Sequence, residues 1–247
     1  MYKFFVNEEQ IEDNKINIID EDVNHIKNVL RLKVEEEICV CNRDISKSYM
    51  CKIVGFDNNS VRCEILKEVL DTTEASTHIH IFQGLPKGDK FEFIIEKCTE
   101  IGVKEITPVI MKRSIVKLDE KDKNKKLERW QKIAEVAAKQ SKRDSILKVN
   151  NIINFQNIFE KVKDYDILLV AYEEEKETTL KKVLNTFKDK QNFKIAIIIG
   201  PEGGIDENEI RLCKENGFTA VTLGKRILRT ETAPLVISSN ILYELED

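Results

Sequence analysis

The residues best suited to chemistry lie in one stretch, Leu223-Gly224-Lys225-Arg226-Ile227-Leu228-Arg229-Thr230-Glu231-Thr232-Ala233-Pro234. A connection between a strand and a helix needs only a few turn residues, so this one carries more polar chemistry than a turn requires. Arg229 and Glu231 flank Thr230, and an internal ion pair would explain them. Alternatively, the Arg229 guanidinium could hold an acidic base or a phosphate, with the Glu231 carboxylate nearby to orient that group or accept a proton.

Two large aliphatic residues, Ile227 and Leu228, lie inside the same loop. Apolar side chains in a loop cost free energy unless they cover something or are covered themselves. They could cover a flat nucleobase, or they could anchor the loop to the core. Leu223 and Gly224 would end a strand that lies beside another strand, Ile195–Ile199.

A second stretch has the organisation strand, glycine-rich loop and helix. Ile195–Ile199 is fully apolar and predicts a buried strand, Gly200-Pro201-Glu202-Gly203-Gly204 follows it, and Asp206 begins a helix. Ligands of open α/β sheets bind at the carboxyl ends of such strands, and glycines let the backbone approach a ligand closely. The loop has neither the GxxxxGK[ST] nor the GxGxxG pattern, so it is not a P-loop or a dinucleotide motif.

The glycine-rich loop is surrounded by negative charge from Glu202, Asp206 and Glu207. Carboxylates at a helix N-terminus occupy the place where a phosphate would bind. The site therefore favours a ligand with a positive centre or hydroxyl groups, such as a sulfonium nucleoside. A tight turn with a helix cap is the structural alternative.

The hydrophobic pattern divides the chain into two domains. Residues 1–70 contain short β-rich runs and one helix, which predicts a small β-barrel of a kind that often binds nucleic acid. Residues 71–77 are polar and predict a linker. From residue 78 to 247, strands alternate with helices, which predicts an α/β domain with a mostly parallel sheet covered on both faces.

Composition excludes several classes of protein. Hydrophobic residues make up 41% of the chain, but no apolar run is long enough to span a membrane. The first residues lack a signal-peptide pattern, so we expect a cytoplasmic protein. The six cysteines form no CxxC pair and the three histidines do not cluster with them. We therefore expect reduced, buried thiols and no metal.

Net charge is −4, but it is unevenly distributed. Residues 84–150 contain 17 Lys and Arg against 11 Asp and Glu, which gives this block a charge of +6. A basic block within an acidic protein is typical of a surface that contacts phosphate groups. The Lys121–Lys126 run by itself reads more simply as the solvated start of a helix.

The glycine-rich loop and the 223–233 stretch together resemble the paired motifs of the SPOUT methyltransferases. They resemble most closely the RsmE-type enzymes, which methylate N3 of a uridine in 16S ribosomal RNA of the small subunit. The resemblance spans nearly the whole chain. Supporting motifs are Leu85-Pro86-Lys87-Gly88-Asp89-Lys90, Glu96 to Val103, Arg113-Ser114, Arg129-Trp130, Ala137 to Ser141 with Arg143, and His25 with Val29-Leu30-Arg31. Lys139 and Lys225 depart from the family pattern.

The resemblance implies a fold and a reaction. The second domain would be an α/β fold whose C-terminal segment threads a trefoil knot, and the first domain would be PUA-like and help to hold RNA. S-adenosylmethionine would be the methyl donor, and the enzyme would be a homodimer. Alternatives are a SPOUT enzyme acting on a ribose 2′-OH or on tRNA, and a non-catalytic RNA-binding factor of ribosome assembly.

The resemblance also assigns roles to residues. Arg229 and Glu231 are the catalytic candidates, with Arg229 stabilising a uracil oxygen or a flanking phosphate and Glu231 acting as base or orienting group. The candidates for cofactor binding are Gly200, Pro201, Glu202, Gly203, Gly204, Leu223, Gly224, Ile227, Leu228, Arg229, Thr230 and Ala233. The candidates for RNA contact are Arg31, Lys87, Lys97, Arg113 and Arg143.

Overall fold

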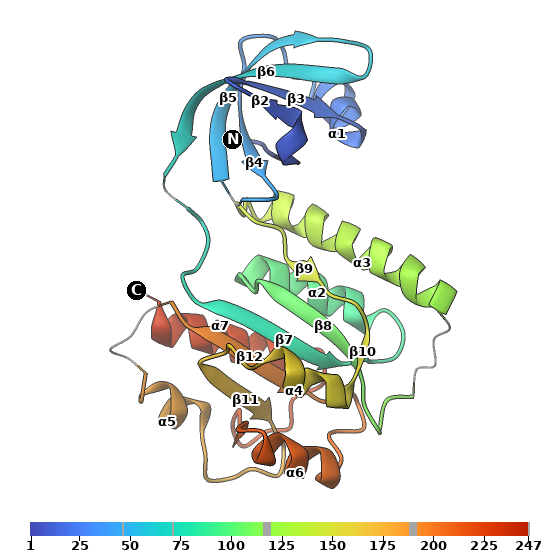
Figure 1. Cartoon of the computed structure of the whole chain (residues 1–247), viewed down its shortest axis with the longest axis vertical. Helices are drawn as coiled ribbons and strands as arrows, with labels where there is room; N and C mark the ends of the chain where they lie inside the picture. Colours follow the sequence, from blue (N-terminus) through green and yellow to red (C-terminus); the bar gives the residue numbers. More distant parts are fainter. Residues whose placement is uncertain (46, 71, 116–119, 188–191, 247) are drawn as a thin grey trace. The chain divides into compact units, whose positions relative to one another are not determined.

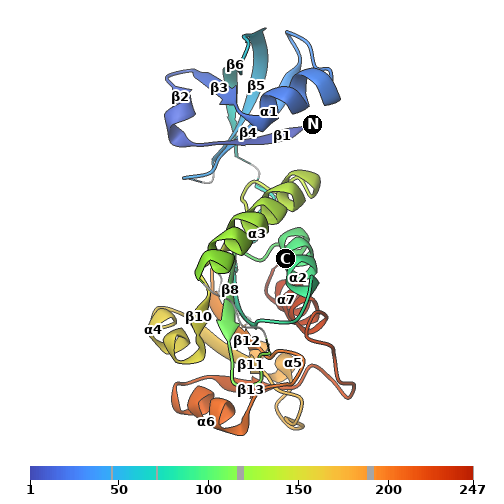
Figure 2. The same cartoon turned by 90° about the vertical axis from the view of Figure 1, so that its right-hand side faces the viewer.

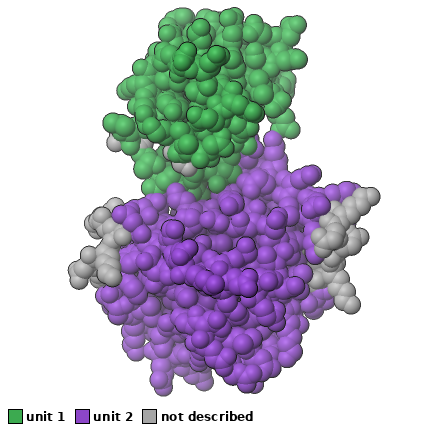
Figure 3. Space-filling view, in the orientation of Figure 1, with its two compact units in different colours: residues 1–74, 138–146 green, residues 75–137, 147–247 purple. Residues whose placement is uncertain are grey.

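The chain folds into two compact units. The first comprises residues 1–74 and 138–146, and the second comprises 75–137 and 147–247 (Figure 3). The first unit therefore includes residues 138–146, which are far from the N-terminus in the sequence. The domain limits expected from the sequence, 1–70 and 78–247, stay a prediction. The computed structural model describes residues 1–45, 47–70, 72–115, 120–187 and 192–246.

The first unit is built on one mixed sheet of six strands in the order β1-β4-β5-β6-β3-β2. β1 and β4 pair in parallel, and the other pairs are antiparallel. Within the described residues β1 and β2 are its edges, so the sheet is a half-barrel where the sequence predicted a barrel. Its strands are β1 Lys3–Val6, β2 Ile11–Glu12, β3 Lys15–Ile19, β4 Glu37–Asn42, β5 Lys47–Phe56 and β6 Ser60–Val69.

The one helix expected within residues 1–70 is short and changes its winding. α1 covers Glu21–Asn24 and continues as a π-helical turn, His25–Val29, in which the Leu30 amide donates to the His25 carbonyl at 2.9 Å. Val23 and Ile26 both enter the core of the unit.

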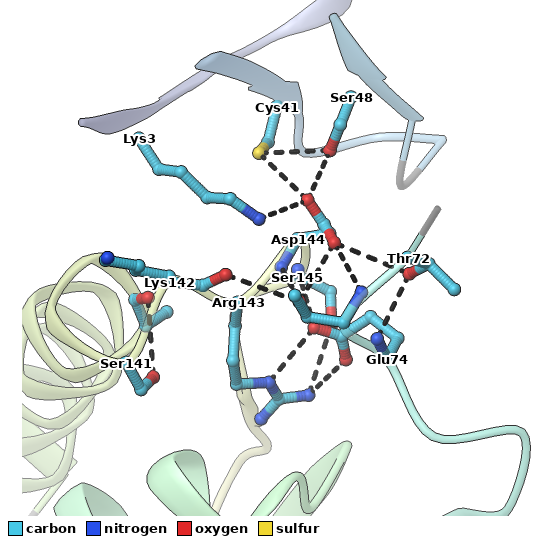
Figure 4. A network of polar contacts seen from close by, with 12 residues as sticks. Lys3, Cys41, Ser48, Thr72, Glu74, Ser141, Lys142, Arg143, Asp144 and Ser145 are labelled. Atoms are coloured by element: carbon cyan, nitrogen blue, oxygen red, sulfur yellow. Dashed lines mark hydrogen bonds and ion pairs between the residues drawn. The ribbon is translucent and has the colours of Figure 1, made fainter. Parts of the chain in front are cut away.

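The carboxylate of Asp144 fastens the 138–146 segment to the rest of the first unit (Figure 4). It accepts hydrogen bonds from Lys3 Nζ at 2.6 Å, Ser48 Oγ at 2.7 Å and the Thr73 amide at 2.7 Å. Burial opposes ionisation, but the Lys3 ammonium and the other donors hold the pKa of Asp144 well below its usual range. The ionised carboxylate is thus an internal anchor.

A second anchor joins Glu74 to Arg143. Arg143 Nη2 lies 2.6 Å from Glu74 Oε2, Arg143 Nε lies 3.1 Å from Glu74 Oε1, and the Asp144 and Ser145 amides also donate to Glu74 Oε1. The Arg143 side chain is only 4% exposed. The sequence prediction that Arg143 contacts RNA therefore needs correction, because burial and this bidentate ion pair withhold its guanidinium from a phosphate.

All six cysteines are free and buried, as expected. Cys39 and Cys41 lie in one cluster, and their thiols come within 4.8 Å of each other and of the Asp144 carboxylate. Lys3 already supplies a positive charge to that carboxylate at 2.6 Å.

The second unit contains a seven-stranded sheet in which every strand pair is parallel, which confirms the expected parallel sheet. The strand order is β10-β8-β7-β12-β11-β13, with β9 also paired to β8. The strands are β7 His78–Gly84, β8 Glu105–Ile110, β9 Lys148–Val149, β10 Ile153–Asn154, β11 Ile167–Ala171, β12 Lys194–Ile199 and β13 Thr219–Val221.

Helices lie on both faces of this sheet (Figure 1). α4 and α6 pack on one face through Ile158, Ile210 and Cys213, while α2 and α7 lie against each other on the opposite face (Figure 2). No helix within the described residues is both long and apolar enough to cross a membrane. The helices are α2 Lys90–Ile101, α3 Glu120–Gln140, α4 Ile158–Lys161, α5 Leu180–Leu184, α6 Glu207–Glu215 and α7 Ala233–Leu245.

Candidate active site

The glycine-rich loop extends from the carboxyl end of β12, an interior strand between β7 and β11. All five apolar residues of β12 are buried, because its neighbours and helices cover both faces. Gly204 has φ +72°, a conformation that an L side chain rarely adopts, and a Cβ there would require the Glu173 carboxylate to shift. The loop ends at Asp206, whose side chain caps α6 by accepting from the Asn208 amide at 3.1 Å. The glycines therefore permit a close approach of two loops.

The second wall of the site is the segment 222–232, which connects the edge strand β13 to α7. It leaves the sheet beside the loop that follows β11, where the Thr222 amide donates to the Thr178 carbonyl at 2.9 Å. It then reaches the end of β12, where Thr230 Oγ1 donates to the Gly200 carbonyl at 2.7 Å. Gln83, at the end of β7, donates to Thr230 Oγ1 at 3.0 Å. These bonds hold the two predicted walls together.

The two walls enclose a cavity of about 410 Å³. Small-molecule sites commonly have volumes of roughly 300–1,000 Å³, so one nucleoside-sized ligand fits. Among the predicted cofactor residues, Gly203 alone does not line the cavity; its carbonyl accepts from Arg113 Nη1 at 3.0 Å. The predicted residues that line it are Gly200, Pro201, Glu202, Gly204, Leu223, Gly224, Ile227, Leu228, Arg229, Thr230 and Ala233.

Sequence reasoning missed part of the lining. Ala171, Tyr172 and Glu173 come from the end of β11, and Lys90 comes from the start of α2. The signal for the β11 residues was present, since parallel strands end at one edge of a sheet. The prediction that the strand before Gly224 lies beside β12 was wrong, because β11 lies between β12 and β13. Lys90 was recognised only as the last residue of the motif Leu85-Pro86-Lys87-Gly88-Asp89-Lys90, without a role of its own.

The cavity wall combines apolar and acidic groups. Ile227 is 84% exposed although it is aliphatic, so it offers an apolar surface that a flat base could cover. Glu173, Glu202 and Glu231 supply carboxylates, which suit a positive centre or hydroxyl groups. This donor set fits a sulfonium nucleoside such as S-adenosylmethionine.

Lysines neutralise much of the acidic charge near the glycine-rich loop. Glu202 Oε1 accepts from Lys90 Nζ at 2.9 Å, and Asp206 Oδ2 accepts from Lys112 Nζ at 2.9 Å. Partial burial opposes ionisation of Glu202, but the Lys90 hydrogen bond holds the pKa of Glu202 below its usual value. The Lys112 hydrogen bond likewise lowers the pKa of Asp206. The carboxylates around the glycine-rich loop therefore repel an anionic ligand less than their number suggests.

The two predicted catalytic residues are adjacent but differ in exposure. The Arg229 side chain is 84% exposed, whereas that of Glu231 is 17% exposed. Arg229 Nη1 and Glu231 Oε1 are 3.9 Å apart, at the limit of an ion pair. Arg229 is therefore not committed to Glu231 and can reach a second ligand, while Glu231 faces the cavity.

The predicted RNA residues separate into groups. Lys87 and Arg113 both border the glycine-rich loop: the Lys87 amide donates to Glu202 at 3.1 Å, and Arg113 donates to Gly203. Lys97 lies on α2 and pairs with Glu96 and Glu100. Arg31 is exposed in the first unit with φ +55°. The structure thus brings together two of the five candidates.

Comparison with known proteins places this geometry in a family. Residues 73–242 match an RNA methyltransferase domain, and residues 18–66 match an RNA methyltransferase PUA domain. The chain is 37% identical to ribosomal RNA small subunit methyltransferase E of Bacillus subtilis (strain 168), covering 100% of this chain and 98% of that protein. It is 38% identical to the protein of the same name from Mesomycoplasma hyopneumoniae (strain 232), covering 99% and 100%.

A solved structure extends the comparison to the cofactor. Ribosomal RNA small subunit methyltransferase E of Neisseria gonorrhoeae, bound to S-adenosyl methionine, superimposes with a TM-score of 0.86 at 32% identity, covering 98% of this chain and 97% of that one. These findings confirm the resemblance drawn from the paired loops. The chain belongs to the RNA methyltransferase family that includes the ribosomal RNA small subunit methyltransferases E.

Proposed function

We propose that this protein transfers a methyl group from S-adenosylmethionine to N3 of a uridine in 16S ribosomal RNA of the small subunit. The observation that carries the proposal is the cavity enclosed by two loops that Thr230 and Gly200 join. Its relatives bear the name ribosomal RNA small subunit methyltransferase E, and one of them was solved with S-adenosyl methionine. The choice of N3 rests on the resemblance to the RsmE-type enzymes.

The residues of the cavity suit this reaction. S-adenosylmethionine supplies an electrophilic methyl group on a sulfonium. The N3 nitrogen of uracil is weakly acidic, so it must lose its proton, and Glu231, which faces the cavity, is positioned to accept it. Arg229, exposed at the rim, would stabilise the negative charge that develops on a uracil oxygen. Since N3 lies on the Watson–Crick edge, the uridine must be unpaired when it enters.

RNA would approach along the basic side chains around the glycine-rich loop. Lys87 and Arg113 border that loop and are exposed, and Lys97 lies further along α2. Arg31 would contribute from the first unit, which contains the PUA match. We propose the limits 1–70 for an RNA-binding domain, 71–77 for a linker and 78–247 for the methyltransferase domain, of which residues 138–146 pack into the first unit.

The proposal includes a trefoil knot and a homodimer. The path of 222–232 supports the knot, since this segment contacts the loop after β11 and then crosses to the end of β12. Phe93 on α2 and Tyr243 on α7 support the dimer, because both are exposed on helices that pack against each other. Sedimentation of the wild type and of Tyr243→Glu would test the dimer.

Labelled methyl transfer tests the function directly. Small ribosomal subunits from cells that lack this protein would be incubated with the enzyme and labelled S-adenosylmethionine. We expect label in 16S ribosomal RNA and a stop of reverse transcription at the modified nucleotide, because N3 methylation blocks base pairing. Labelled RNA without a stop would indicate ribose methylation. RNA binding without label or cofactor binding would indicate an assembly factor.

A further inference from the structure

Lys90 lies at the point where three segments of the cavity meet. It is the first residue of α2, and its ammonium contacts both the glycine-rich loop and the segment that carries Glu231. Lys90 Nζ lies 2.9 Å from Glu202 Oε1 and 3.6 Å from Glu231 Oε2. Lys90 has no part in the methyl transfer proposed for Arg229 and Glu231.

Glu231 depends on Lys90 for its nearest positive charge. Its Oε2 atom is buried and has no hydrogen-bond partner within the described residues, so the ammonium at 3.6 Å is its closest cation. Among the described residues, Arg229 is the other cation paired with this side chain, at 3.9 Å from Oε1, and Arg229 is highly exposed. A buried carboxylate oxygen without partners is unfavourable, so removal of Lys90 would leave Glu231 free to turn away.

Lys90 is itself held in place. Its hydrogen bond with Glu202 raises the pKa of Lys90, so the ammonium remains charged at neutral pH. Glu202 in turn accepts from the Lys87 amide at 3.1 Å, which fixes the carboxylate between the start of α2 and the glycine-rich loop. Lys90 therefore connects the placement of Glu231 to the loop that lines the cofactor cavity.

We propose that Lys90 is a positioning residue that holds the Glu231 carboxylate in the cavity, with Glu202 as its support. The inference rests on the proposed function, since it assigns Lys90 a part in that reaction. A positioning role predicts a loss in turnover that acts through Glu231, because misplacement of a reacting group by about 1 Å costs roughly 100-fold in rate.

The main test is a double-mutant cycle of Lys90→Met and Glu231→Gln in the full chain. We expect Lys90→Met to lower kcat by about ten- to 100-fold while KM for the small subunit and the affinity for S-adenosylmethionine stay near wild type. Lys90→Arg should restore most of the rate. In the Glu231→Gln background the Lys90 substitution should have no further effect.

A matched control removes another ammonium–carboxylate pair. Lys52 lies 3.0 Å from Glu35 and is similarly accessible, so Lys52→Met should leave kcat unchanged. If Lys90→Met is as active as Lys52→Met, or if the losses of Lys90→Met and Glu231→Gln multiply, the inference is overturned.

A readout without catalysis separates this inference from the proposed function. The Thr232 and Ala233 amides donate to the Arg229 carbonyl at 2.8 and 3.0 Å, so their hydrogen exchange reports the order of the Glu231 segment. We expect several-fold faster exchange in Lys90→Met and no change in Lys52→Met. The proposed function fails if the wild type methylates no ribosomal RNA. Independently of that result, unchanged hydrogen exchange in Lys90→Met would overturn the positioning role of Lys90.

Discussion

Thr230 Oγ1 donates a hydrogen bond of 2.7 Å to the carbonyl oxygen of Gly200, although the two residues are 30 positions apart. Thr230 is buried, and its hydroxyl also accepts from Gln83. A single hydroxyl thus connects the ends of β7 and β12 to the segment before α7. The shape of the cavity depends on this connection.

Replacing Thr230 by Val should weaken cofactor binding. The substitution keeps the shape of the side chain but removes the 2.7 Å bond to the Gly200 carbonyl, which retains only a 3.4 Å hydrogen bond from Gln83 Nε2, at a cost of about 1–3 kcal/mol. We expect S-adenosylmethionine to bind roughly tenfold more weakly, measured by calorimetry. Thr230→Ser keeps the hydroxyl and should bind within about twofold of wild type; equal affinity for Val and Ser would contradict the role of this bond.

Gly204→Ala should damage the cavity more than a comparable glycine substitution elsewhere. Gly204 and Gly88 both have positive φ, +72° and +62°, but a Cβ at Gly88 meets open space, whereas one at Gly204 displaces the Glu173 carboxylate, which lines the cavity. Both variants carry about 1 kcal/mol of backbone strain, so their melting temperatures should fall similarly from that source. Only Gly204→Ala should also lose cofactor affinity in calorimetry. Equal affinities for the two variants would mean that the approach of Glu173 does not matter.

Arg229→Ala should separate binding from turnover. The side chain is exposed at the rim and makes one long ion pair, so its loss should change the melting temperature and cofactor affinity little. If it stabilises charge on the uracil, methyl transfer should fall by about 100-fold or more. Arg211→Ala, which removes an exposed arginine from α6, should keep wild-type activity. An Arg229→Ala enzyme with the native rate would remove Arg229 from the mechanism.

The free energy of unfolding should decrease in acid through His80. Burial lowers the pKa of His80 to about 4 from 6.5, and its ring nitrogens contact Tyr165 OH at 2.6 Å and Thr107 Oγ1 at 2.7 Å. Between these pH values the unfolded chain binds a proton that the native chain does not, so stability falls as pH drops from 6.5 to 4, by at most about 3 kcal/mol. Chemical unfolding at a series of pH values would measure this slope.

Substitutions would show which side chain causes the change in the free energy of unfolding with pH. His80→Gln should flatten this slope between pH 6.5 and 4. Glu105 acts in a lower pH window, because the His78 ring 3.2 Å away and the hydrogen bond from Asn150 outweigh burial and lower its pKa to about 2 from 4.5. The stabilisation that the ionised Glu105 carboxylate gives to the fold is present above pH 4.5 and is lost between pH 4.5 and 2. A wild-type slope in His80→Gln would contradict the assignment.

Asp144→Asn should destabilise the protein far more than an exposed aspartate substitution. The Asp144 carboxylate accepts from Lys3, whose side chain is mostly buried, and breaking a buried ion pair costs about 3–5 kcal/mol. Asp57 pairs with Arg62 at 3.0 Å, but both are more than half exposed, so Asp57→Asn should cost less than about 1 kcal/mol. Urea unfolding monitored by circular dichroism would compare them. Similar values would show that Asp144 is not an anchor.

The sequence predicted the elements of the site better than their contacts. The apolar run Ile195–Ile199 and the glycines after it predicted a buried strand and a ligand loop, because burial and backbone freedom are local properties. The order of the parallel strands is not local, so the position of Glu173 beside Gly204 was not foreseen. The same limit explains Arg143, which looked like a free basic residue because its partner Glu74 lies 69 positions away.

The segment 138–146 has a consequence for dividing this protein into parts. Ala138 packs with Phe5, Cys39 and Cys41, and Asp144 supplies the partner of Lys3. An N-terminal fragment that ends within residues 71–77 would lose the Ala138 contacts and the Asp144 ion pair, and it would expose an apolar surface. The RNA-binding unit therefore cannot be expressed intact from one continuous stretch of sequence. A portable version would have to carry 138–146 by fusion or circular permutation.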